Sequence, residues 1–276
     1  MDIEKHAHII VINSKDNPDL NAAIAANLAV ELMEEKHNVA TVDLDGKDGV
    51  LSRFFNIRVQ FEKNNKIWIK IPFHNAVLSE KKSDLSVFLQ EADTKFDAVI
   101  IPSPSKKNNF KSEFFAADTL VTVLEDKTSL ALLSEPEPSK NNILKPSAYT
   151  NFVWEIKKHL AVARKKALNW VVLPYQAAQI VEKQHNFLQE ISKKYGFRLM
   201  PKILPRDIIF ELMNEGLTLF DLNNPALKNK MNLSWLGAKL EYRNFAEFAL
   251  NQADNSIYYK KKEKSYDNKN SRNKAV

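Results

Sequence analysis

The residues that could bind a phosphate lie in one turn near the start of the chain. The turn, residues 13–20, reads NSKDNPDL and lies between an apolar stretch at 8–12 and a helical pattern that begins at Asn21. A turn from strand to helix presents backbone N–H groups where phosphate oxygens bind. Here it contains no glycine, and Lys15 is its only lysine. The sequence therefore predicts the scaffold of a phosphate site without its usual chemistry.

Two carboxylates, Asp43 and Asp45, follow the short apolar stretch 39–42. They fall at the carboxyl end of a predicted strand, where α/β sheets place ligands. Asp45 is the residue that we expect to act if any hydrolytic activity remains. The alternative is structural, with both carboxylates bonded to neighbouring loops. The six histidines are scattered and cysteine is absent, so the sequence predicts no metal site.

The elements that must position these residues alternate between apolar strands and amphipathic helices. Strands are predicted at residues 8–12, 39–42, 66–71, 96–101, 119–124 and 169–173. Helices are predicted at residues 21–36, 84–92, 149–168, 177–195, 207–213 and 232–252. The alternation indicates an α/β fold with a doubly wound, mostly parallel sheet flanked by helices.

Local signals refine this prediction. Asp19 is expected to cap the first helix, and Gly196 to end the helix at 177–195. The continuously apolar strand 96–101 is expected to be central and parallel. The segment 134–147, with three prolines, is predicted to be a linker between the two halves of the chain.

Composition bounds the class of protein. The 276 residues suffice for one large domain, which we place at residues 1–253. No apolar run approaches the roughly 20 residues that span a bilayer, so a cytoplasmic protein is expected. Residues 254–276 are predicted to be a disordered tail, because from residue 260 onward seven basic residues face two acidic ones. The tail could be a solubilising terminus or an arm that binds nucleic acid or anionic lipid.

The predicted helix at 149–168 is strongly basic. Its candidate contacts to nucleic acid are Lys157, Lys158, Arg164, Lys165 and Lys166. Such a surface binds DNA phosphates without sequence preference. A solvated helix face would have the same composition, so both interpretations stay open.

Longer stretches resemble the MipZ family, the division-plane positioning ATPases of alphaproteobacteria within the ParA/MinD group of P-loop ATPases. The similarity runs to about Gln252 and is carried by VDLD at 42–45, SRFF at 52–55, PSAY at 146–149, VWE at 153–155, NWVVL at 169–173, GFR at 196–198 and GLTLFDL at 216–222. The resemblance implies the ParA/MinD-type fold. It also implies a cytoplasmic protein at the nucleoid or a cell pole.

The resemblance does not extend to the nucleotide contacts. The family's signature lysine falls on Asp16, its loop glycines on Asn17, Pro18 and Leu20, its second lysine on Asn21 and its magnesium-binding hydroxyl on Ala22. The Walker B aspartate falls on Pro102, and the pair that flanks adenine falls on Tyr175 and Gln176. Only Asp43 and Asp45 remain. We therefore expect neither ATP nor magnesium as a cofactor.

These observations lead to a hypothesis of function by binding, without catalysis. The preferred hypothesis is a pseudo-ATPase of division-site positioning or chromosome partition that has lost the Walker A and B motifs. Alternatives are a residual or altered ATPase and a structural heterodimer partner of an active family member. The family's partners are ParB-like and FtsZ-like proteins and DNA, and whether the chain forms a homodimer or a heterodimer stays open.

Overall fold

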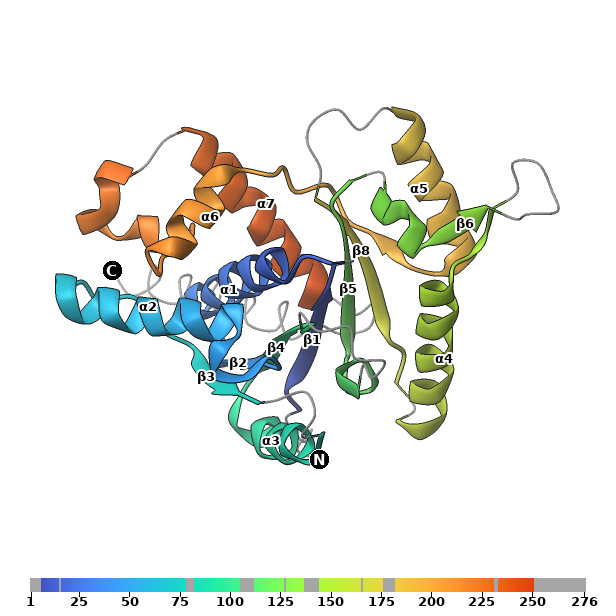
Figure 1. Ribbon diagram of the computed structural model, residues 1–276, viewed down its shortest axis with the longest axis horizontal. Coiled ribbons are helices and arrows are strands. Elements are labelled where there is room, and N and C mark those ends of the chain that lie inside the picture. Colours follow the sequence, from blue (N-terminus) through green and yellow to red (C-terminus); the bar gives the residue numbers. More distant parts are fainter. Residues whose placement is uncertain are drawn as a thin grey trace, which may run out of the picture.

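The computed structural model describes residues 6–14, 16–77, 82–104, 112–126, 128–136, 144–164, 166–175, 182–230 and 233–250. The strands are β1 (His8–Asn13), β2 (Val39–Asp43), β3 (Phe73–Ala76), β4 (Ala98–Pro102), β5 (Thr119–Leu124), β6 (Ser134–Pro136), β7 (Leu144–Pro146), β8 (Asn169–Pro174) and β9 (Arg198–Leu199). The helices are α1 (Pro18–Glu34), α2 (Val50–Asn65), α3 (Lys82–Lys95), α4 (Ala148–Ala163), α5 (Glu182–Tyr195), α6 (Asp207–Asn214) and α7 (Leu233–Leu250), with short 3₁₀ turns between them (Figure 1).

Seven strands form one parallel sheet in the order β3-β2-β4-β1-β5-β8-β9. β1 lies near its centre and pairs with β4 and β5, so that Ile10 is opposite Ile100 and Thr119. β4 lies between β2 and β1, which confirms that the apolar strand predicted at 96–101 is central and parallel. The predicted doubly wound α/β fold is therefore the observed one.

Helices cover both faces of this sheet (Figure 1). Ile10 and Ile12 belong to a core with α1, α2, α6 and α7, whereas Val11 belongs to a second core with α3, α4 and α5. The separation follows from the alternation of side chains along a strand. α1 is buried continuously from Leu20 to Leu32, because it packs between the sheet and the other helices of its layer.

The alternating segment 66–71 does not form the predicted strand. Its backbone groups pair with side chains: Lys70 O accepts bonds from Arg58, and Asn224 donates to Trp68 O at 3.2 Å. The edge strand β3 follows it and pairs with β2. Alternation of apolar and polar residues indicates an extended chain. In this segment, side chains of other helices and loops bond to the backbone, and no strand of the described chain does.

Several predicted boundaries also change. Asp19 is not the helix cap: α1 begins at Pro18, and its cap is Asn17. α4 ends at Ala163, five residues before the predicted end. The segment expected to be a linker contains β6 and β7, which pair as antiparallel strands. Gly196 does follow α5, with a φ of 72°, as predicted.

Candidate functional site

The loop between β1 and α1 is closed by its own side chains. Asn17 Oδ1 accepts the N–H of Leu20 at 2.9 Å and thereby caps the helix. Ser14 Oγ accepts the N–H of Asn17 at 3.1 Å and donates to the carbonyl of the same residue. Pro18 stands at the first helical position, where a missing N–H is tolerated. The end of the helix that could face a phosphate is thus capped internally.

Asn21 completes this closure from within α1. Its side chain is buried, and Oδ1 accepts the N–H of Ser14 at 2.8 Å. Its amide nitrogen donates toward the carbonyl of Ser103 at 3.5 Å, beyond the end of β4. The neighbouring Ala22 is also buried and carries no oxygen. The amide therefore connects the loop to the next strand of the sheet.

The charged side chains that the structure describes at this end of α1 are negative. Asn17 Nδ2 donates to Glu125 Oε2 at 2.7 Å, which places a carboxylate from the end of β5 against the loop. Asp16 and Asp19 are exposed at the start of the same helix. Carboxylates are stabilised at a helix N-terminus, because the N–H groups there carry partial positive charge. These carboxylates therefore place negative charge at the end of α1 where a phosphate would have to bind.

Asp43 has a structural arrangement at the end of β2. Its carboxylate accepts the N–H groups of Ser52 at 2.8 Å and Asp45 at 3.0 Å, so it holds the start of α2. A Cβ at Gly49 would lie 2.2 Å from this carboxylate, which explains the glycine. Burial raises the pKa of Asp43, although the two N–H bonds oppose that shift. Asp45 is half-buried beside it.

The position expected to flank adenine is part of the core. Tyr175 is buried beyond the end of β8, and burial raises the pKa of its hydroxyl to about 12. Its neighbour Gln176 lies outside the described residues. At the position of the expected Walker B carboxylate, Pro102 ends β4, and the next residue, Ser103, donates its N–H to Ile12 O.

The basic residues of the predicted helix contact different partners. Lys157 donates to Gly196 O and lies over the ring of Trp170, and burial lowers its pKa. Lys158 pairs with Glu155 on the exposed helix surface. Arg164 donates to Ala116 O at 3.1 Å. Lys166 pairs with Asp118 at 2.7 Å, and Lys165 lies outside the described residues.

Two polar networks were missed from the sequence. Ser52 Oγ donates to Gly46 O and contacts His74 Nε2 at 2.9 Å, while His74 Nδ1 contacts Thr41 Oγ1. Desolvation lowers the pKa of His74 to about 4, so this imidazole is neutral at pH 7. Because the serine proton points to a carbonyl, the serine–histidine pair is built for structure and is not an activated nucleophile.

The second network joins Arg58 of α2 to Asp221 by two bonds of 2.7 Å. The remaining Arg58 donors contact Gly216 O and Lys70 O. Arg58 follows Phe54 by four residues on the buried stripe of its helix, and this spacing could have revealed it. The buried pair explains how the GLTLFDL motif at 216–222 is held against α2.

Two other kinds of site are absent from the described ranges. No group of three or more histidine, aspartate or glutamate side chains there could hold a metal ion. In the same part of the chain, no helix has the length and apolar character needed to cross a membrane.

A family model described as ATPase MipZ matches residues 8–251. The chain belongs to the MipZ family. The match spans both the loop at β1 and the GLTLFDL motif, so the whole described sheet is part of the MipZ fold. No curated protein matches the chain.

Solved structures of ParA/MinD-type ATPases share the fold of this MipZ-family chain. The cell division ATPase MinD from Pyrococcus furiosus matches with a TM-score of 0.53 and 17% identity, over 88% of this chain and 98% of that chain. A plasmid partition protein from Borrelia burgdorferi bound to AMPPNP matches with a TM-score of 0.51 and 12% identity, over 88% of this chain and 98% of that chain. A chain of the MinC:MinD complex from Aquifex aeolicus matches with a TM-score of 0.50 and 13% identity, over 91% of this chain and 99% of that chain. These likenesses show that the chain shares the fold of these ATPases.

Proposed function

We propose that this MipZ-family protein acts in division-site positioning or chromosome partition by binding partners without a nucleotide cycle. The observation that carries the proposal is the closure of the β1–α1 loop. Three of its N–H groups, on Ser14, Asn17 and Leu20, already donate to side chains of the same loop and helix. In a P-loop such groups hold the phosphates.

A phosphate would have to replace these internal bonds. Each is worth about 0.5–1.5 kcal/mol net, so breaking three costs roughly 1.5–4.5 kcal/mol before any contact is gained. This cost lowers the affinity by roughly 10-fold to 2,000-fold, since each 1.4 kcal/mol is tenfold. The residues present do not fit the phosphates of ATP.

Charge adds a second obstacle. Glu125 contacts the loop, and Asp16 lies where the resemblance places a lysine. At about 4 Å and an effective dielectric of about 20, two like charges repel by roughly 4 kcal/mol. Ala22 has no hydroxyl for magnesium. We infer that neither ATP nor magnesium is a cofactor of this chain.

The partners follow from the family and stay part of the proposal. A complex with a ParB-like or FtsZ-like protein would place this chain in the cytoplasm, at the nucleoid or at a cell pole. The resemblance to the family favours an alphaproteobacterial cell as the setting of such a complex. Of the candidate DNA contacts, Lys158 and Arg164 have exposed side chains. Lys157 and Lys166 are held by Gly196 O and by Asp118. Among the candidates that the structure describes, Lys158 and Arg164 would therefore be the residues that bind duplex DNA.

Light scattering and an ATP turnover assay on the full chain test this function. We expect the same mass with and without Mg-ATP, and phosphate release no faster than in a protein-free blank. The Asp45→Asn variant is the matched control, because Asp45 is the expected residue for any residual hydrolysis. Phosphate release that disappears in Asp45→Asn, or a dimer that forms only with Mg-ATP, would contradict the proposal.

A further inference from the structure

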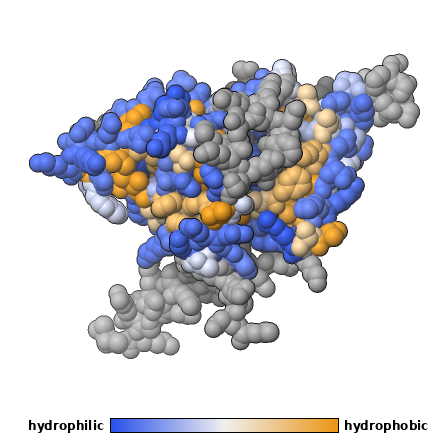
Figure 2. Space-filling view, turned by 60° about the horizontal axis from the view of Figure 1, so that its bottom comes forward, coloured by the Kyte–Doolittle hydropathy of each residue, from blue (hydrophilic) through white to orange (hydrophobic). Residues whose placement is uncertain are grey.

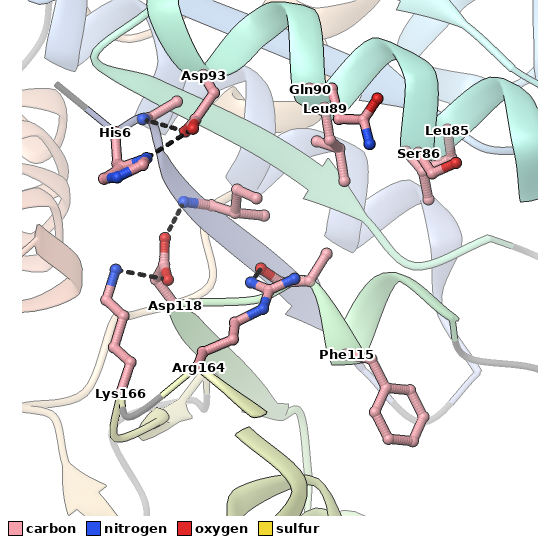
Figure 3. Close-up of a pocket in the computed structure, with 13 residues that line it drawn as sticks. His6, Leu85, Ser86, Leu89, Gln90, Asp93, Phe115, Asp118, Arg164 and Lys166 are labelled. Atoms are coloured by element: carbon pink, nitrogen blue, oxygen red, sulfur yellow. Dashed lines mark hydrogen bonds and ion pairs between the residues drawn. The ribbon is translucent and has the colours of Figure 1, made fainter. Parts of the chain in front are cut away.

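A pocket of about 620 Å³ lies at the end of the sheet where the strands begin, and the β1–α1 loop lies at the opposite end (Figure 3). Ile9 near the start of β1 and Asp118 just before β5 line it, so it opens at the amino ends of these strands. Its volume falls within the roughly 300–1,000 Å³ that small-molecule sites occupy. The pocket shares no lining residue with the loop that closes the head of α1.

Two walls of the pocket are apolar. Leu85 and Leu89 of α3 lie on one side and Phe115 lies on the other, and Ile9 and Ala116 also line the pocket. Phe115 is 37% exposed, which is a large value for a phenylalanine in a folded domain. Figure 2 turns the bottom of Figure 1 forward and shows hydrophobic surface among hydrophilic surface on that face of the molecule. An apolar body inserted between these walls would remove their surface from water.

The two carboxylates of the pocket already have partners. Asp118 accepts the N–H of Ile9 at 2.9 Å and pairs with Lys166. Asp93 accepts the N–H of Ala7 at 3.0 Å and contacts His6 Nδ1 at 2.6 Å. Figure 3 shows both arrangements at the side of the pocket that lies away from Phe115. Neither carboxylate therefore needs a cation from outside.

Arg164 differs from these groups. Its guanidinium lies between Phe115 and Asp118, and one nitrogen donates to Ala116 O at 3.1 Å. Within the described chain no carboxylate forms an ion pair with it. A guanidinium carries five donors and binds carboxylates or phosphates through two parallel bonds. Its remaining donors are available to an anion that enters the pocket.

We propose that this pocket binds a small amphipathic anion. The anionic group contacts the Arg164 guanidinium, and the apolar body lies between Leu85, Leu89 and Phe115. Ser86 and Gln90 add polar atoms on the α3 side of the pocket. A medium-chain carboxylate is the simplest ligand with this chemistry.

Titration of the ¹⁵N-labelled full chain with octanoate and with octylammonium tests the proposal by NMR. The two probes share an apolar chain and differ in charge. We expect saturable shifts around Ile9, Leu89 and Phe115 for octanoate, with a dissociation constant below about 1 mM and a preference over octylammonium of at least about tenfold.

Variants at Arg164 separate a binding role from a structural one. Arg164→Lys should keep the preference for the anion, whereas Arg164→Glu should reverse it in favour of octylammonium. Arg164→Gln should abolish the preference without reversing it, which keeps the test valid if Arg164→Glu does not fold. Arg53→Glu is the matched control, because Arg53 is exposed on α2 and does not line the pocket. It should change neither titration.

Three results would overturn the proposal. The first is the absence of saturable octanoate binding below about 1 mM. The second is equal binding of the two probes by the natural chain. The third is a preference that is the same in folded Arg164→Gln and in the natural chain.

Discussion

The closure of the loop predicts a measurable cost for removing the side chain of Asn21. In Asn21→Ala the N–H of Ser14 loses its acceptor, Asn21 Oδ1, which lies 2.8 Å away. Ser14 is 5% exposed, so water does not readily replace that acceptor. A buried donor left without a partner costs about 1–3 kcal/mol. The free energy of unfolding should fall by that amount.

Urea denaturation followed by circular dichroism gives this free energy, and a thermal scan gives a second measure. For a chain of this size, 1 kcal/mol corresponds to about 2–4 °C, so the expected loss is about 2–12 °C. Asn56→Ala is the matched control, because Asn56 is exposed within α2. Both variants replace an asparagine in a helix by alanine, so their change in helix propensity is the same. It should change stability by less than about 0.5 kcal/mol.

An Asn21→Ala protein as stable as Asn56→Ala would refute this reasoning. It would mean that the Asn21 amide does not hold the Ser14 N–H, and that this N–H is available to a phosphate. A loss within the expected range would support a loop that is satisfied without ligand.

Three further predictions concern the rest of the fold. Asp221→Asn should cost about 3–5 kcal/mol in urea denaturation, because it leaves the buried Arg58 without its counter-charge; the same loss from Glu155→Gln at the exposed Lys158 pair would contradict this. The pKa of His74 is lowered to about 4 from 6.5, so its contribution to stability is complete above pH 6.5 and is lost as the pH falls toward 4, by about 3 kcal/mol. His74→Asn should flatten the pH dependence of the melting temperature in that window, and an unchanged slope would refute it. Lys157→Glu should lower the melting temperature, because it removes the contacts to Gly196 O and Trp170, whereas Lys158→Glu should not; equal effects would show that Lys157 does not support the fold.

Apolar runs made the central strands of the sheet predictable. β4 and β5 are buried along their whole lengths, so burial on both faces leaves a direct signal in the sequence. The first helix was placed correctly, but its start was not, because Asn17 and Pro18 compete with Asp19 for the cap. Caps depend on which side chain reaches a particular N–H, and sequence order alone does not fix that.

The segment 66–71 shows why other parts could not be predicted. Its alternating isoleucines indicate an extended chain, but Arg58 and Asn224 take the carbonyls that a neighbouring strand would have used. These partners are distant in sequence, and the pairing of Arg58 with Asp221 spans 163 residues. In the loop at β1, the absence of glycine and of the family's two lysines was visible in the sequence. The replacement of phosphate contacts by Asn17 and Asn21 required the structure.

Calorimetric titration of the full chain with Mg-ATP tests the central claim most directly. The three internal N–H bonds and the carboxylates at the head of α1 predict no heat of binding beyond dilution up to about 100 µM free nucleotide, equivalent to roughly 5.5 kcal/mol. Saturable binding of Mg-ATP tighter than about 100 µM would contradict the account and restore a nucleotide cycle to this member of the MipZ family.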